Sequence, residues 1–151
     1  MKPEESYWSV VETVWETISI YDGEKVFLSQ YAQAPLIARH LFASHWCQSE
    51  VRNGGLRQFF TNRTGVLAPE AIEAFEAIGM PEISKILKKA VKLFGTPYPR
   101  AKTARAKLIC GSNKAEFNKK LDELDDEFFS YLSFENGGYE NAADSYAKAQ
   151  R

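Results

Sequence analysis

The polar residues with the most suggestive spacing surround a glycine pair near the middle of the chain. The motif comprises Glu50, Asn53, Gly54, Gly55, Gln58, Phe60, Asn62 and Gly65. Glycine adopts positive φ without a Cβ clash, so Gly54 and Gly55 predict the end of one helix and the start of another. Carboxylate and amide groups that are buried at such a corner need hydrogen-bond partners. The motif therefore forms either a structural latch or a binding site.

Histidine, cysteine and glutamate residues, which often act in catalysis or metal binding, are present, but their spacing does not suit either role. His40 and His45 lie five positions apart, which points them to different faces of a helix. Neither a His-Glu-x-x-His nor a Cys-x-x-Cys motif occurs, and Cys47 has no basic setting nearby to activate its thiol. Glu50 and His45 are also five apart, and no nucleophile completes a catalytic pair. The sequence predicts no catalytic residue, no metal site and no cofactor. It favours a buried latch that joins the central helix to the helix pair beginning at Pro69.

The charged residues are unevenly distributed, although the net charge is only −1. Between residues 85 and 120, where Glu116 is the acid, the cations are Lys85, Lys88, Lys89, Lys92, Arg100, Lys102, Arg105, Lys107, Lys114, Lys119 and Lys120. Acids dominate from residue 121 onward, and the candidates for one partner-binding row are Asp122, Glu123, Asp125, Asp126 and Glu127. The basic stretch suits phosphates and the acidic row suits a basic partner. Mutual compensation is the simplest interpretation, because Lys119 lies within helical reach of both Asp122 and Glu123.

The elements that position these residues are all predicted to be helices. We expect helices over 4–20, 24–32, from 35 to the glycine pair, 69–79, 81–95, 100–110 and 114–132, with a weak terminal helix or tail over 139–151. Proline near the start and glycine after the end delimit 69–79 and 81–95. Apolar stripes at helical spacing predict 4–20, where Val11 and Ile18 lie on the stripe, and 114–132, where Phe117, Leu121 and Leu124 do. Sustained two-residue alternation, which would indicate strands, is not seen. The predicted fold is an all-α bundle of about six to eight helices.

Length and composition indicate a single domain over residues 1–151. Cys47 and Cys110 lack the spacing of a disulfide framework, so we expect free thiols. The N-terminus is charged and has no apolar signal-peptide region, and no apolar run reaches the length of a membrane span. We therefore expect a cytoplasmic protein with no membrane partner. The sequence leaves its oligomeric state open.

The glycine-pair motif resembles the signature of a bacterial family of small all-helical proteins. The similar run is Glu50-Val51-x-Asn53-Gly54-Gly55-x-x-Gln58-x-Phe60-x-Asn62-x-x-Gly65, and the likeness covers roughly residues 35–130. The resemblance implies an α-helical fold, a cytoplasmic location, no cofactor and a protein partner. One branch of the family is described as DNA-mimic proteins, whose acidic side chains occupy the DNA-binding surface of a transcription factor.

Three functions follow as hypotheses. The first is a non-enzymatic interaction protein that binds an unidentified partner, such as a DNA-binding regulator, through the acidic row of residues 122–127. The second is direct nucleic-acid binding through the basic 85–120 stretch, with Phe94 and Tyr98 as stacking groups. The third is an enzyme with a pocket at the 50–62 corner, which an open pocket and an unpaired Glu50 would favour. The near-neutral charge and the basic stretch differ from what a DNA mimic is expected to carry.

Overall fold

The structure is a computed structural model that describes residues 6–111 and 114–150. These residues form eight α-helices and no strand, which confirms the all-α prediction. The helices are α1 (Trp8–Glu12), α2 (Glu24–Gln33), α3 (Leu36–Thr61), α4 (Ala68–Ala77), α5 (Pro81–Leu93), α6 (Lys102–Ile109), α7 (Lys114–Leu132) and α8 (Tyr139–Ala149). Two short 3-10 helices, η2 (Arg63–Leu67) and η3 (Glu135–Gly137), lie between them.

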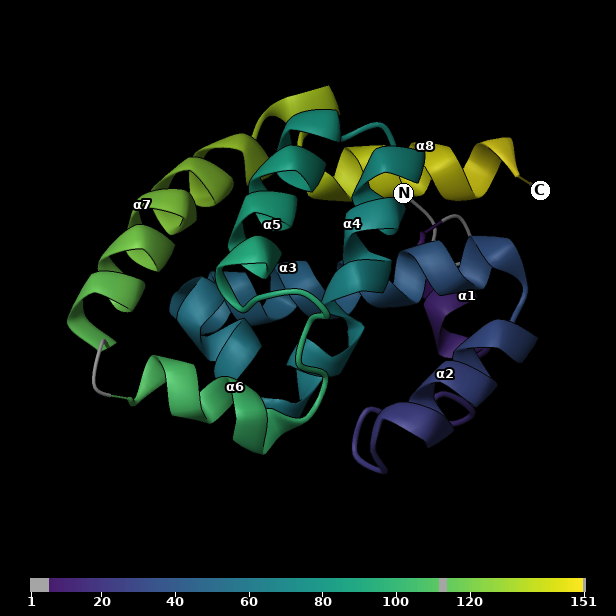
Figure 1. Cartoon of the computed structure of the whole chain (residues 1–151). Helices are drawn as coiled ribbons and strands as arrows, with labels where there is room; N and C mark the ends of the chain where they lie inside the picture. The colour runs from purple at the N-terminus through teal and green to yellow at the C-terminus, as the bar shows by residue number, and fades with distance from the viewer. Residues whose placement is uncertain (1–5, 112–113, 151) are drawn as a thin grey trace.

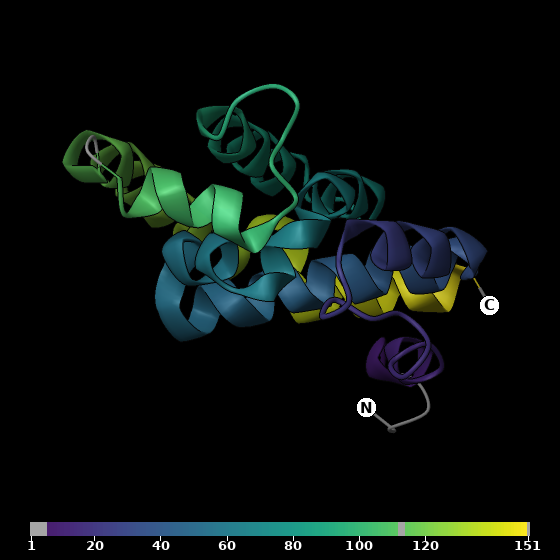
Figure 2. The ribbon, with the colours of Figure 1, turned by 60° about the horizontal axis from the view of Figure 1, so that its bottom comes forward.

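Helix α3 is the element around which the others pack (Figure 1). It contacts α1, α4, α6, α7 and α8, while α5 packs against α4 and α7. Figure 2 shows α8 running alongside α3, so the C-terminal helix returns to the middle of the chain. Apolar side chains over more than half of the circumference are typical of a helix that is covered on several sides. The result is one compact body.

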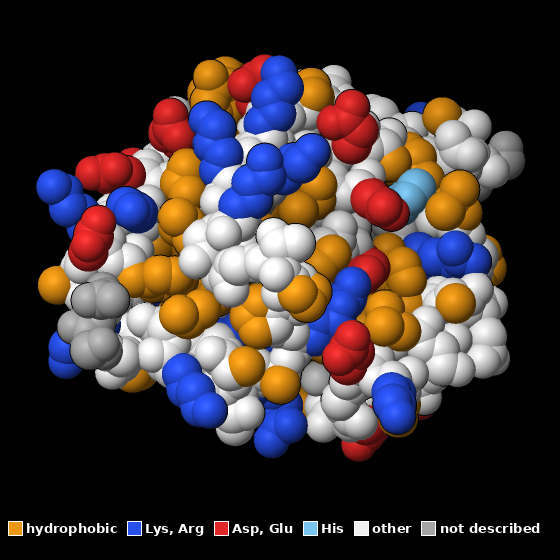
Figure 3. All heavy atoms as spheres, viewed as in Figure 1, with side chains coloured by type: hydrophobic (Ala, Val, Ile, Leu, Met, Phe, Trp, Pro, Cys, Tyr) orange, Lys and Arg blue, Asp and Glu red, His pale blue; other side chains and the backbone are white. Residues whose placement is uncertain are grey.

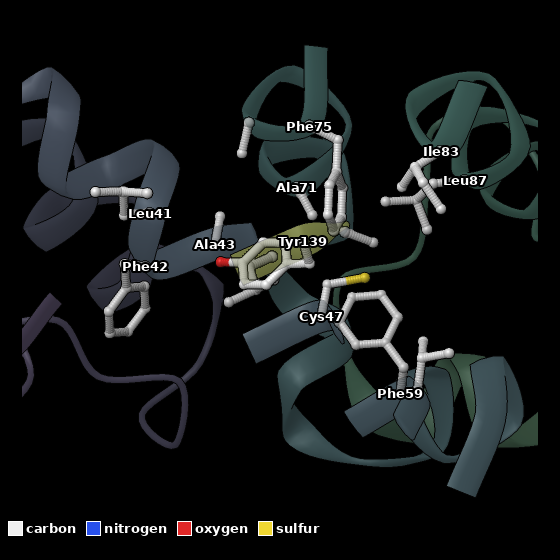
Figure 4. Close-up of a cluster of buried hydrophobic side chains, with 14 of the residues drawn as sticks. Leu41, Phe42, Ala43, Cys47, Phe59, Ala71, Phe75, Ile83, Leu87 and Tyr139 are labelled. Atoms are coloured by element: carbon white, nitrogen blue, oxygen red, sulfur yellow. The ribbon is translucent and has the colours of Figure 1, made fainter. Parts of the chain in front are cut away.

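The core lies where α3, α4, α5 and α8 meet (Figure 4). Cys47, Phe59, Phe75 and Tyr139 are fully buried there. The Tyr139 hydroxyl is 2.9 Å from the Ser44 Oγ and hydrogen bonded to it, which satisfies both buried groups. The expectation of only a weak terminal helix or tail after residue 139 is therefore too cautious. Helix α8 is a core element, although its buried side chains other than Tyr139 are small alanines that give little sequence signal.

The N-terminal helix is much shorter than the 4–20 helix expected from the sequence, and residues 4 and 5 lie outside the described part. Helix α1 ends at Glu12, and the chain continues as turns. Thr13 and Thr17 donate their hydroxyls to the carbonyls three residues earlier, at 2.6 and 3.2 Å. Hydroxyl and β-branched side chains weaken a helix in this way. The apolar stripe still reaches the core, because Val11 and Ile18 are buried.

Helices α4 and α5 form the tight pair that their proline and glycine residues predict. Gly79 adopts φ +85°, and the Met80 N–H bonds to the Phe75 carbonyl at 2.8 Å, which closes the end of α4. A contact missed by sequence reasoning caps the start of α5. The Glu135 carboxylate accepts the N–H groups of Glu82 and Ile83 at 2.8 and 3.1 Å.

Candidate functional site

The glycine pair breaks α3 into two segments, as the sequence predicts. Gly55 adopts φ +78°, in the left-handed region, whereas Gly54 has φ −156° and needs no positive φ. The conformational demand for glycine therefore falls on Gly55 alone. Beyond the break, the chain continues as a second helical segment that ends at Thr61.

The polar residues on either side of the break form one hydrogen-bonded group, which we call the polar latch: Glu50, Asn53, Gln58 and Asn62. The Glu50 Oε2 accepts hydrogen bonds from the Gln58 and Asn62 amides at 2.7 and 3.0 Å. Asn53 in turn donates to Gln58 at 3.2 Å. The latch differs from expectation in two respects. Asn53 is exposed and the other three are half-buried, and the contacts join the two segments of α3 rather than α3 to α4.

The corner that holds the polar latch is open to solvent. A pocket of about 210 Å³ lies beside Glu50 and Asn62, with Trp46 and Tyr21 on its walls. The Glu50 carboxylate is held by two amides rather than left unpaired. Within residues 6–111 and 114–150, no group of three His, Cys, Asp or Glu side chains is placed to hold a metal ion. An open pocket is one of the two features that the enzyme hypothesis requires, and the unpaired carboxylate is the one it lacks.

Gly65 has a different role, which depends on Arg105. The Arg105 side chain is fully buried, and its guanidinium donates to four backbone carbonyls, those of Phe60, Asn62, Pro99 and Arg100. Two of these carbonyls lie at the end of α3, where the helix dipole is negative. A Cβ on Gly65 would lie 2.6 Å from the Arg105 Nε, so only glycine leaves room for the guanidinium. Burial lowers the pKa of Arg105, and the carbonyls replace its lost hydration.

The basic 85–120 stretch does not form one surface. Arg105 is buried, and Arg100 pairs with Glu70 at 2.7 Å. The expected stacking groups are also unavailable, because Phe94 is only 5% exposed and the Tyr98 hydroxyl donates to the Gly65 carbonyl at 2.6 Å. Lysine side chains instead gather over α5 (Figure 3).

The acidic row on α7 divides into two groups. Asp125 accepts the Leu56 N–H at 2.7 Å, and Asp122 pairs with Arg57 at 3.0 Å. Burial raises the pKa of the Asp125 carboxyl, and the Leu56 hydrogen bond opposes that shift. The other acids of the row, Glu123, Asp126 and Glu127, are exposed and make no ion pair with any described residue. Three of the five predicted carboxylates therefore remain available to a partner.

Sequence reasoning missed one residue beside these acids. Phe129 is 51% exposed, whereas the adjacent Phe128 is fully buried. Phe129 lies three positions after Asp126, so the two share a face of α7. The signal was present, because Phe128 continues the apolar stripe of Leu121 and Leu124 on α7, whereas Phe129 lies one position off that stripe. We call Glu123, Asp126 and Glu127 the α7 acidic face, and Phe129 borders it beside Asp126.

His45 and the buried Cys47 contribute to packing, and their environments do not suit catalysis. The His45 Nδ1 is 2.9 Å from the Tyr7 hydroxyl, and Trp8 and Trp15 pack against the His45 ring. Burial lowers the pKa of His45 to about 4, so the ring is neutral at pH 7. Burial also raises the pKa of the Cys47 thiol, which is opposite to the shift that a nucleophilic thiol requires.

Three comparisons place these features among known proteins. A family model described as "DMP19-like protein" matches residues 32–150, a longer span than the 35–130 indicated by the motif. No curated protein and no solved structure gives a significant match. None of the described helices is long and apolar enough to cross a membrane.

Proposed function

Because this chain belongs to the DMP19-like protein family, we propose that it is a non-enzymatic interaction protein that binds another protein through the α7 acidic face. The observation that carries the proposal is the exposed Phe129 ring one helical turn from the unpaired Asp126 carboxylate, on a helix that also exposes the unpaired Glu123 and Glu127. Exposed aromatic side chains surrounded by charged groups are typical anchors of protein interfaces. A row of acids that only faces solvent would not require an exposed aromatic side chain beside it.

The partner that best complements this face is a basic protein, and a DNA-binding regulator is the specific case we propose. Side chains three or four positions apart on a helix lie about 5–6 Å from one another. Glu123, Asp126 and Glu127 have this spacing, so they present carboxylates to lysines and arginines that otherwise contact phosphates. Phe129 adds an apolar contact with the protein partner, which the phosphates of DNA itself cannot make.

The two alternative functions have less support. Direct nucleic-acid binding loses its stacking groups, because Phe94 and Tyr98 belong to the core. An enzyme at the 50–62 corner would need a nucleophile or base beside Glu50, and Glu50 already accepts two amide hydrogen bonds. The open pocket at that corner is better explained as the solvent side of the polar latch.

Capture from an extract of the producing cells tests the proposal. The purified chain is immobilised and exposed to the extract at about 50 mM and about 500 mM salt, because exposed ion pairs weaken as screening increases. We expect a basic protein that is retained at low salt and released at high salt. A chain carrying Phe129→Ser should retain much less of it. If no salt-sensitive protein is retained, the proposal is wrong.

A further inference from the structure

A row of lysines runs along the solvent side of α5. Lys85, Lys88, Lys89 and Lys92 are spaced by three or four positions, so neighbouring ammonium groups lie on adjacent turns of one face. The row forms one wall of a groove of about 310 Å³ between α5 and α7. Figure 3 shows the positive side chains gathered over this part of the surface.

The charge of this row is largely uncompensated. Lys85 pairs with Glu82 on its own helix at 3.2 Å, but Lys88, Lys89 and Lys92 make no ion pair anywhere in the described chain. Like charges four positions apart, such as Lys88 and Lys92, destabilise a helix slightly. An anionic occupant relieves that repulsion, so the groove has a physical preference for negative charge.

The groove is not only basic. Ile86 lies at its base and is 5% exposed, and Tyr131 of α7 is half-buried on the opposite wall. Glu82 and Glu127 also border it, so the lining carries both signs of charge with an excess of lysine. An occupant must therefore offer anions for the lysines, an apolar group for the base, and hydrogen-bond donors that tolerate carboxylates.

We propose that this groove binds an acidic amphipathic polypeptide segment, with carboxylates on either side of an apolar side chain. A helical peptide supplies carboxylates at the three- and four-residue spacing of the lysines and an apolar side chain between them. The N–H groups of the first turn of such a helix have no partner within it, so they can donate to Glu82 or Glu127. A phosphate backbone matches the lysines equally well, but it has no apolar group for Ile86.

The groove is distinct from the surface used in the proposed function. The α7 acidic face selects a basic partner, whereas the groove selects an acidic one. The two surfaces meet at Glu127, which belongs to the α7 acidic face and also lines the groove. A partner bound on one surface therefore changes the charge that borders the other. The groove would retain its specificity even if the proposed function were wrong.

The test uses a rhodamine-labelled, alanine-based helical peptide with glutamates spaced four residues apart around a central leucine. Binding to the full chain is followed by fluorescence anisotropy at low salt, and amide NMR shifts locate the site. Two double variants carry the same change of charge. Lys88→Gln with Lys89→Gln alters the groove, whereas Lys107→Gln with Lys148→Gln alters exposed lysines that do not line it.

We expect the groove variant to weaken binding about fivefold and the control variant to weaken it less than about twofold, since each exposed ion pair contributes modestly. The amide shifts should concentrate in α5 and at Tyr131, and a peptide with serine in place of leucine should bind less tightly. Equal loss in both variants, or no binding, would overturn the proposal. So would tighter, groove-dependent binding of a single-stranded oligonucleotide, which would assign the groove to phosphates.

Discussion

The Asp125 carboxylate accepts the Leu56 N–H at 2.7 Å, so α7 caps the second segment of α3 just after its break. The glycine at the break makes this approach possible. A Cβ on Gly55 would lie 2.8 Å from the Asp125 Oδ2. The break and the cap therefore form one structural unit, and Asp125 serves the fold although it lies in an acidic row.

This division of the acidic row predicts different effects of neighbouring substitutions on stability. Asp125→Ala should lower the free energy of unfolding by about 1–2 kcal/mol, because the Leu56 N–H loses its acceptor at a helix start. Asp126→Ala should change it by less than about 0.5 kcal/mol, because Asp126 is exposed and unpaired within the described residues. Urea unfolding measures both values. Equal effects would show that Asp125 is not a cap.

Gly55 should be more sensitive to substitution than another glycine with a similar backbone. Gly23 has φ +92° and no atom within 4 Å of the position that a Cβ would occupy, so Gly23→Ala reports the positive φ alone. Gly55→Ala adds the contact with Asp125, and it should cost more than the roughly 1–3 kcal/mol of a non-glycine residue in this sparsely populated backbone region. Thermal and urea unfolding of the two variants check the difference. Indistinguishable losses would contradict the close approach of α7.

Arg105 should be among the most sensitive positions in the chain. Arg105→Met removes a buried guanidinium that satisfies four backbone carbonyls, and we expect a loss of about 3 kcal/mol. Lys107→Met on the same helix is the control, because Lys107 is exposed. Urea unfolding distinguishes them. A loss below about 1 kcal/mol for Arg105→Met would mean that water replaces the guanidinium.

The half-buried His45 predicts that the free energy of unfolding decreases in acid. Its pKa is about 4 in the folded chain and about 6.5 when unfolded, so below pH 6.5 the unfolded state binds the proton more readily. The stability that the neutral His45 ring provides is fully present above pH 6.5 and is lost as the pH falls toward 4. Between about pH 7 and about pH 4.5 the loss should be about 2–3 kcal/mol. His45→Gln should remove that part of the pH dependence in urea unfolding, and an unchanged profile would contradict it.

The features that the sequence predicted are those determined by nearby residues. Pro81 and Gly79 delimit helices locally, and the helical spacing of Phe117, Leu121 and Leu124 specifies which face of α7 packs inward. The predicted length of the 4–20 helix was wrong because the prediction relied on the apolar stripe alone. The β-branched and hydroxyl side chains in this segment weaken the helix. Helix α8 was underestimated because its buried alanines can be recognised as core residues only when the structure shows α8 packed on α3.

The candidate site was predicted less completely, because charge alone does not reveal which partners a side chain meets. Asp122, Asp125 and Arg105 look like surface charges in the sequence, yet each is bound by a residue distant along the chain. The polar latch was recognised as a group from its spacing, but its exposure depends on how α3 bends. The exposure of Phe129 was predictable because it lies outside the apolar stripe that contains Phe128, but only the structure shows that Asp126, one turn away, is unpaired.

The central claim, that the α7 acidic face binds a basic protein, is tested most directly by the dissociation constant of the captured partner. It is measured for the wild-type chain, for a variant carrying Glu123→Gln, Asp126→Asn and Glu127→Gln, and for a control carrying Glu12→Gln, Glu16→Gln and Glu76→Gln. The control removes the same charge from exposed acids elsewhere. We predict about tenfold weaker binding for the first variant and less than about twofold for the control. Equal weakening in both, or none in either, would contradict the claim.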